Sequence, residues 1–129
     1  MSRERGVRLQ LALARYLQRW WPNAESAGSG RNGTDITGTP GIVWECKTAR
    51  EFRPLEWCRQ ASMHTLCNCK TICAPGCDGD TGAIAVTVYL PNGLGEKSMD
   101  TAIAMMPLSA MTWLLTKAGY GTREEPSCR

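Results

Sequence analysis

The stretch "DITGTPGIVWECK", Asp35 to Lys47, decides the fold because it joins a turn to a strongly apolar segment. The Thr, Pro and Gly residues in its middle are typical of a tight turn. The β-branched and aromatic residues Ile42–Trp44 are typical of a strand. We therefore expect a β-hairpin whose strands lie around 35–36 and 42–47. The apolar strand runs directly into Glu45-Cys46-Lys47, which places two opposite charges two residues apart.

These charges fall on one face of the expected strand, because side chains alternate between the faces and Trp44 and Cys46 take the other. The expected turn brings Asp35 beside Glu45 and Lys47. Two neighbouring carboxylates repel each other unless a positive group lies between them, and Mg²⁺ or Mn²⁺ suits oxygen ligands. A nearby lysine can position a water molecule and stabilise a developing oxyanion. The pattern indicates a hydrolytic metal site suited to a phosphodiester; the alternative is a surface hairpin with a weak salt bridge.

The segments around this stretch indicate an α/β fold with a mixed central sheet flanked by helices. Helical spacing of apolar residues predicts a first helix, and proline at a first turn begins each of the two later ones. A strongly apolar segment, Ala83–Leu90, predicts a central strand. The expected order is α-β-β-α-β-β-α, with helices at 5–21, about 54–65 and from 107 to a C-terminal cap at Gly119, and a last strand within 100–106.

The segment "GTDITGTPGIVWECKTAR" resembles the PD-(D/E)xK nuclease superfamily. Within it, the chain looks most like the small Holliday-junction-resolvase-type endonucleases of bacteriophages that infect actinobacteria. The further match comprises "YLPNGLG" (Tyr89–Gly95), Asp100 and a final helix ending in "KAGYG", so that the resemblance covers roughly residues 3–121.

This resemblance implies a restriction-endonuclease-like core and a Mg²⁺-dependent (or Mn²⁺-dependent) DNA endonuclease acting in phage DNA recombination or processing. Asp35 and Glu45 would hold the metal and Lys47 would be the catalytic lysine. The product would carry a 5′-phosphate. The partners implied are branched or duplex DNA and a second copy of the chain, because a four-way junction needs two symmetric cuts.

Four further residues are expected to support the site. Many relatives carry a first-helix glutamate that reaches the metal, and the corresponding position here is Gln10, which could ligate only through its carbonyl oxygen. Gln60 of the second helix lies where the superfamily often places a polar residue. Ser29 and Arg31 could contact a phosphate from the glycine-rich loop, although such loops are also plain connectors. The first helix is basic on one side, which suits a phosphate-contacting surface or a solvated face; its arginines are Arg3, Arg5, Arg8, Arg15 and Arg19.

A second motif is the cysteine cluster in "HTLCNCKTICAPGC", where one histidine and four cysteines fall within fourteen positions. Closely spaced thiolates in a reducing compartment indicate a structural Zn²⁺ with four ligands. The expected ligands are Cys67, Cys69, Cys73 and Cys77, with His64 as an alternative. Free thiols in an insertion would give the same pattern.

The composition fits one globular domain, with 129 residues, 43% hydrophobic residues and a net charge of +3. We expect a single nuclease domain over 1–121 with a cysteine-rich insertion at about 64–80, and a mobile polar tail at 122–129. The N-terminal segment shows no signal peptide and no stretch approaches a membrane span, so a cytoplasmic location is expected. For a phage-encoded protein this is the cytoplasm of the bacterial host.

Two other functions fit the same sequence. One is another nuclease of the same superfamily that nicks, cuts flaps or degrades ends. The other is a non-catalytic, zinc-stabilised DNA-binding module, in which Gln10 would mark a decayed metal site.

Overall fold

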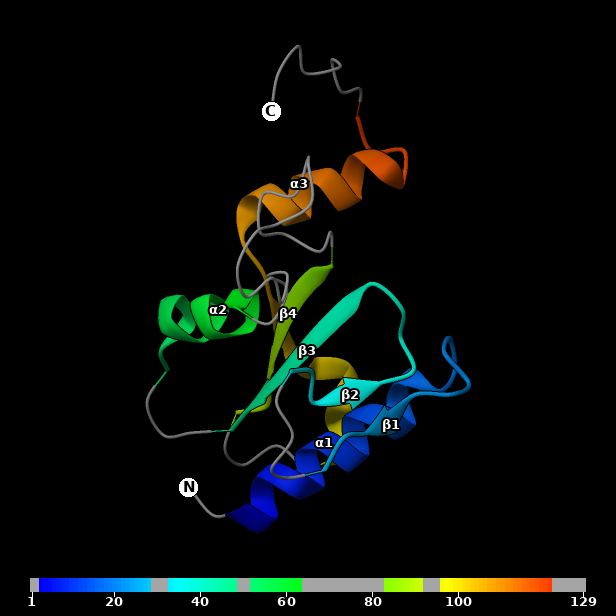
Figure 1. Ribbon diagram of the computed structural model, residues 1–129, viewed down its shortest axis with the longest axis vertical. Helices are drawn as coiled ribbons and strands as arrows, with labels where there is room; N and C mark the ends of the chain where they lie inside the picture. The colour runs from blue at the N-terminus through cyan, green and yellow to red at the C-terminus, as the bar shows by residue number, and fades with distance from the viewer. Residues whose placement is uncertain (1–2, 29–32, 49–51, 64–82, 92–95, 122–129) are drawn as a thin grey trace, which may run out of the picture.

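The computed structural model describes residues 3–28, 33–48, 52–63, 83–91 and 96–121. This part of the chain is a mixed α/β structure with three α-helices and two sheets (Figure 1), which confirms the expected class. Its elements in chain order are α1 (Arg3–Leu17), β1 (Glu25–Ser26), β2 (Ile36–Thr37), β3 (Ile42–Lys47), α2 (Pro54–Met63), β4 (Ile84–Tyr89), the 3-10 helix η1 (Glu96–Thr101), β5 (Ile103–Met105) and α3 (Leu108–Lys117).

The main sheet has the strand order β3-β4-β5. β3 and β4 are parallel, in register from Ile42 opposite Ile84 to Lys47 opposite Tyr89, and β5 is antiparallel to β4. The connection between β3 and β4 contains α2, as parallel strands require a long crossover. The central position expected for the apolar strand is confirmed for β4.

The expected hairpin between residues 35–36 and 42–47 is wrong. β2 pairs with β1 in a separate two-stranded antiparallel sheet, and the predicted order lacked β1. Next to β3, the Asp35 amide donates to the Trp44 carbonyl (2.8 Å), but the Trp44 amide donates to the Thr34 hydroxyl (2.8 Å). Because a side-chain oxygen takes the place of a backbone carbonyl, no ladder forms, although Asp35 still lies beside β3.

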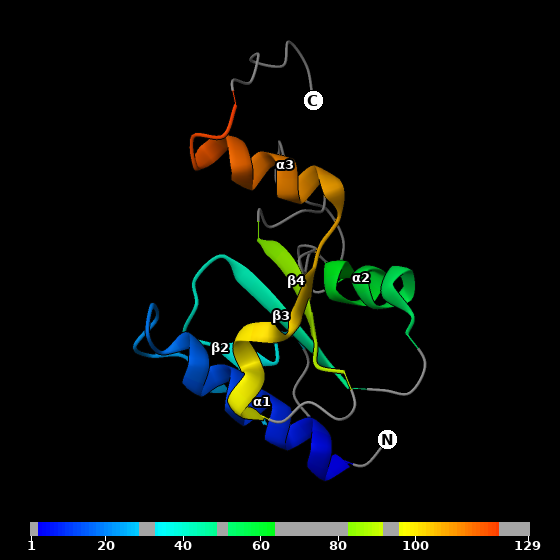
Figure 2. The ribbon, with the colours of Figure 1, turned by 180° about the vertical axis from the view of Figure 1, so that it is seen from behind.

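The two faces of the main sheet carry different helices (Figures 1 and 2). On one face, α1 packs its buried leucines against Trp44 and the even-numbered side chains of β4. α2 contacts β3 and β4, and the Thr87 hydroxyl of β4 donates to the Trp57 carbonyl of α2 (3.4 Å). Buried residues of the α1 core are Leu9, Leu13, Ala14, Leu17, Ala24, Ile36, Trp44, Val86, Val88, Leu90 and Met99.

The C-terminal ends of α1 and α3 differ from the expected ones, by four residues at α1 and by one residue at the cap of α3. α1 ends at Leu17, four residues early, because the Trp20 and Trp21 amides both donate to the Leu17 carbonyl (3.0 and 2.9 Å) and turn the chain. Trp20 is 56% exposed after this turn. α3 ends at Lys117 with Ala118 as its cap residue, one position before the expected cap. Gly119 follows, and its φ of +98° lets the Tyr120 amide reach back to the Leu115 carbonyl (2.8 Å).

None of the described helices has the length and apolar character needed to cross a membrane.

The turn after β2 contains two glycines, Gly38 and Gly41, whose replacement by alanine should have different effects on stability. Gly38 and Gly41 share a φ of +84°, but a Cβ at Gly38 would overlap the Asn23 carbonyl, whereas one at Gly41 meets nothing within 4 Å. We expect Gly41→Ala to lower the free energy of unfolding by about 1–2 kcal/mol through backbone strain. Gly38→Ala should cost a further 1–3 kcal/mol or so through overpacking. Urea denaturation of both variants measures the difference, and equal losses would contradict the close approach.

Candidate metal and catalytic site

The site is built on the outer edge of β3, which in the main sheet has β4 on its other side only. Residues 34–35 run along this edge and supply acceptors for its outward-facing amides. The Asp35 carboxylate accepts a hydrogen bond from the Cys46 amide through Oδ2 (2.8 Å). Cys46 lies between Glu45 and Lys47, so this bond fixes the carboxylate against the backbone that carries both charged side chains.

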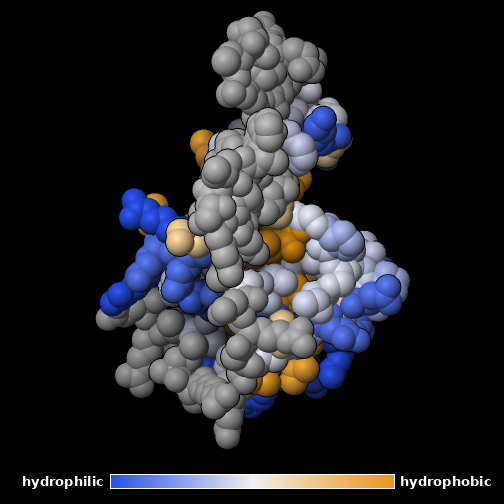
Figure 3. Space-filling model, in the orientation of Figure 1, coloured by the Kyte–Doolittle hydropathy of each residue, from blue (hydrophilic) through white to orange (hydrophobic). Residues whose placement is uncertain are grey.

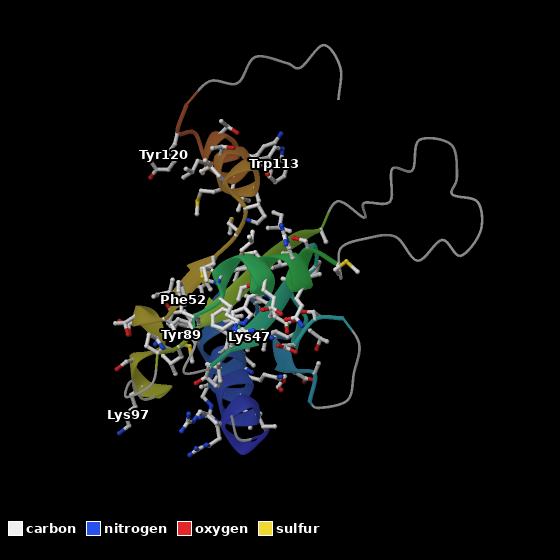
Figure 4. All side chains as sticks on the ribbon, turned by 90° about the vertical axis from the view of Figure 1, so that its left-hand side faces the viewer. Lys47, Phe52, Tyr89, Lys97, Trp113 and Tyr120 are labelled. Carbon is white, nitrogen blue, oxygen red and sulfur yellow. The ribbon has the colours of Figure 1, made fainter. Side chains whose placement is uncertain are left out.

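Lys47 is held from two directions on the face of β3 that carries α2. Its Nζ lies 3.4 Å from Glu45 Oε1 and donates to Gln60 Oε1 of α2 at 3.0 Å. The side chains of Lys47 and Glu45 are 20% and 16% exposed, so both are reachable from solvent without being free in it. The same-face placement of Glu45 and Lys47 is confirmed by this ion pair, and Gln60 lies beside the lysine. Figure 4 shows Lys47 close to Tyr89 and Phe52.

An aromatic cluster holds α2 in the position that brings Gln60 to Lys47. Tyr89 pairs with Lys47 in the β3–β4 register, and its ring lies 5.4 Å from Trp57 and 5.2 Å from Phe52 between centroids. Trp57 is nearly buried and packs edge-on against Phe52. Because these rings join the start of α2 to the end of β4, they limit how far Gln60 can move from the lysine.

The charged groups of the site affect the pKa of the Cys46 thiol. Burial raises the pKa of Cys46 well above the usual 9.0, and the charges of Asp35 and then Glu45 raise it further, while Lys47 lowers it. Both carboxylates and the lysine thus act electrostatically on one atom.

The donors at this edge suit a hard divalent cation. Asp35 and Glu45 offer carboxylate oxygens, and a carboxylate has enough lone-pair sites to accept from an amide and still bind a cation. Over the described ranges, no three His, Cys, Asp or Glu residues form a group that could hold a metal alone. Two carboxylates fit Mg²⁺, which usually retains several waters and binds substrate phosphate oxygens.

Only some of the residues expected to support the site lie in the described part of the chain. Gln10 accepts a hydrogen bond from the Ser26 hydroxyl through Oε1 (3.0 Å), which holds the amide side chain of α1 against β1. Ser29 and Arg31 lie outside the described residues, and so do the expected zinc ligands Cys67, Cys69, Cys73 and Cys77 with His64. Their roles stay predictions, as does the cysteine-rich insertion.

Sequence reasoning missed the roles of Thr34 and of the Cys46 amide. Thr34 both donates to the Ile36 carbonyl (2.7 Å) and accepts from the Trp44 amide. Its position directly before Asp35 is the available signal, because Thr hydroxyls often bond to nearby backbone at turns.

Comparison with known proteins adds no relative: no protein-family model, curated protein or solved structure matches this chain. The resemblance to the PD-(D/E)xK superfamily therefore stays a prediction, and the functional argument depends on the geometry of the site.

Replacing Asp35 separates its structural role from its chemical one. Asp35→Ala removes the acceptor of the Cys46 amide, so we expect the free energy of unfolding to fall by about 1–3 kcal/mol. Asp35→Asn keeps an oxygen acceptor and should lose less than half as much. Chemical denaturation of the two variants checks this order. If Asp35→Ala is as stable as the wild type, the carboxylate does not support the edge of β3.

Proposed function

We propose that the protein is a metal-dependent DNA endonuclease with Asp35, Glu45 and Lys47 at its active site. The observation that carries the proposal is the 2.8 Å bond between the Asp35 carboxylate and the Cys46 amide, because it sets this carboxylate beside the strand segment that bears Glu45 and Lys47. A salt-bridged surface strand would not require a third charged group at the same place.

The metal of the proposed site is Mg²⁺ or Mn²⁺, held by Asp35 and Glu45. When bound, such an ion would polarise the scissile phosphate and supply an activated water molecule. The expected structural Zn²⁺ of the cysteine cluster has no part in this chemistry.

Lys47 supplies the fixed positive charge of the site. Its ammonium group is oriented by Glu45 and Gln60, so it can donate to a phosphate oxygen on which negative charge develops, or to the attacking water. In the hydrolysis proposed, a bond forms between the water oxygen and phosphorus and the bond from phosphorus to the 3′-oxygen breaks. A proton passes to the 3′-oxygen, which leaves a 5′-phosphate and a 3′-hydroxyl.

The arrangement of elements is compatible with the restriction-endonuclease-like core implied by the sequence resemblance. An edge strand carries Glu45 and Lys47, a crossover helix follows it, and a central parallel strand lies next to it. Among nucleases of this type we favour a Holliday junction resolvase acting on branched DNA, following the sequence resemblance.

We further propose a homodimer that forms through α3 and the groove beside it. α3 has no buried residue and one charge among its ten residues, Lys117. Leu108, Met111, Trp113 and Leu115 are 37–75% exposed. In the space-filling view only small apolar (orange) areas can be made out in the upper part of the molecule (Figure 3). An adjoining groove of about 770 Å³ is lined by α2, β5 and α3, and Arg59 is its one charged lining residue.

A second copy of the chain is the occupant that this surface fits best. Both the protruding apolar helix and the groove belong to one continuous face, which a two-fold axis can make self-complementary. Since the face is almost uncharged, two copies meet there without the repulsion expected from a net charge of +3 each.

Cleavage assays test the proposed activity. We expect the wild-type protein to cut a four-way junction in Mg²⁺ or Mn²⁺ by paired symmetric nicks and to be inactive in EDTA. Asp35→Asn, Glu45→Gln and Lys47→Met should each lower the rate at least about 100-fold while the protein stays folded. Junction, flap and linear duplex compared side by side identify the substrate.

The control for this assay is Glu56→Gln, which removes a carboxylate that is 61% exposed on α2 and paired with Arg53. It should cut at the wild-type rate. A wild-type protein that cuts no DNA in either metal, or a Lys47→Met variant as active as the wild type, would contradict the nuclease assignment. Equal cutting of flaps or ends would favour another nuclease of the superfamily.

Sedimentation velocity tests the dimer. The wild-type protein should sediment as a dimer at micromolar concentration, and Leu108→Glu should shift it to a monomer, because a charge would replace an apolar side chain that is 75% exposed. Leu11→Glu places the same charge at a half-exposed leucine of α1 and should leave the dimer intact. A wild-type monomer at all concentrations would overturn the proposal.

A further inference from the structure

A second charged feature lies away from the catalytic residues, between the C-terminal half of α1 and η1. A cavity of about 530 Å³ opens there, with Arg15, Arg19 and Lys97 among its lining residues. Asp100 is the one acidic lining residue, so the lining carries three positive charges and one negative charge. Lys97 points outward from η1 (Figure 4). Across the described ranges, no ion pair engages Arg15, Arg19 or Lys97.

The aromatic residues beside this cavity hold one of its cations in place. The Arg19 guanidinium lies over the Tyr16 ring, 5.2 Å from its centroid, and the Tyr16 ring packs edge-on against Trp20 at 5.3 Å. A guanidinium stacked on a ring loses less conformational freedom when it binds an anion, and its fork of donors suits phosphate oxygens.

The basic residues of α1 continue beyond the cavity in a line. Arg8 and Arg15 lie on the side of α1 opposite Leu9, Leu13 and Leu17, which are 2–5% exposed, and Arg19 follows in the turn after the helix. From Arg8 to Arg15 the helix rises about 10 Å. This equals roughly three steps of one strand of duplex DNA, at about 3.4 Å each.

We propose that this cavity and the adjoining line of arginines, together called the α1 basic surface, bind the phosphate backbone of DNA. The ligand is a polyanion because several cations are spaced along a helix, whereas a small anion would need only the cavity. A lipid surface fits less well, since the apolar face of α1 is occupied by the core and cannot insert into a bilayer. The inference rests on the proposed function only in taking DNA as the polyanion.

The α1 basic surface is separate from the catalytic residues. Glu45 and Lys47 face α2, whereas α1 packs with Trp44 and the side chains of the opposite face of the sheet. DNA bound along α1 is therefore held by groups that take no part in cleavage. A branched substrate presents more than one duplex arm, and one arm can lie on α1 while another occupies the catalytic edge.

Fluorescence anisotropy of a labelled four-way junction and a labelled duplex, in EDTA so that no cleavage occurs, tests the proposal. Arg15→Gln, Arg19→Gln and Lys97→Gln should each weaken binding by up to about eightfold at 0.1 M salt. Each should also lower the slope of log K against log salt by about 0.9, the value for one phosphate contact. Asp100→Asn should strengthen binding, because it removes the one negative charge of the cavity.

The matched control is Arg53→Gln, which removes one exposed positive charge just before α2. It should bind as the wild type does, with an unchanged salt slope. If the cavity variants behave like Arg53→Gln, or Asp100→Asn does not strengthen binding, the α1 basic surface does not contact DNA. Inorganic phosphate that competes at micromolar concentration would instead indicate a small-anion site and also overturn the proposal.

The binding test and the cleavage assay can reject their two hypotheses independently of each other. A protein that binds DNA through α1 but cuts none retains the further inference and loses the proposed nuclease activity. A protein that cuts DNA with unaltered affinity in all cavity variants has the reverse outcome. Asp35→Asn, which should not cut, serves as a background in which the binding measurements can be repeated in Mg²⁺.

Discussion

The hydrogen bond from the Cys46 amide to the Asp35 carboxylate is the interaction on which the candidate site depends. β3 is an edge strand of the main sheet, and the outward-facing amides of Trp44 and Cys46 need acceptors on that side. Thr34 and Asp35 supply them with side-chain oxygens instead of a paired strand. One carboxylate thus closes the sheet edge and lies next to Glu45 and Lys47.

The alternation of side chains along β3 gives the rest of the geometry. Trp44 is 8% exposed in the α1 core, and its indole N–H donates to the Thr39 hydroxyl at 2.9 Å, so its buried polar atom has a partner. With Trp44 fixed on one face, Glu45 and Lys47 must project from the other, where α2 supplies Gln60. A shift of the strand by one residue would exchange these faces and bury both charges.

The sequence predicted the parts of the structure that follow from local pattern. The apolar segment of β4, the proline starts of α2 and α3, and the glycine end of α3 are each specified by nearby residues. The same is true of Glu45 and Lys47 sharing a face. The predicted hairpin failed because a two-residue strand, β1, has no recognisable pattern, yet it takes β2 as its partner. Asp35 reaches β3 by a different connection from the predicted one, through Thr34 and a single backbone bond.

The sequence alone could predict only part of the α1 basic surface. The arginines were evident from their helical spacing, but the cavity also needs Lys97 and Asp100, about eighty residues further along the chain. Only the packing of η1 on α1 brings these groups together. Likewise, the sequence predicted α3 as a helix but not its exposure, and its lack of any buried residue follows from its place at the end of the molecule (Figure 1).

The most direct test of the central claim is a crystal structure with Mn²⁺, using the anomalous scattering of the metal. The account predicts one strong anomalous peak at the edge of β3, with oxygen atoms of both Asp35 and Glu45 about 2.0–2.2 Å from it, as for a hard divalent cation. No peak there, at a Mn²⁺ concentration that supports cleavage, or a peak bound only by other carboxylates, would contradict it.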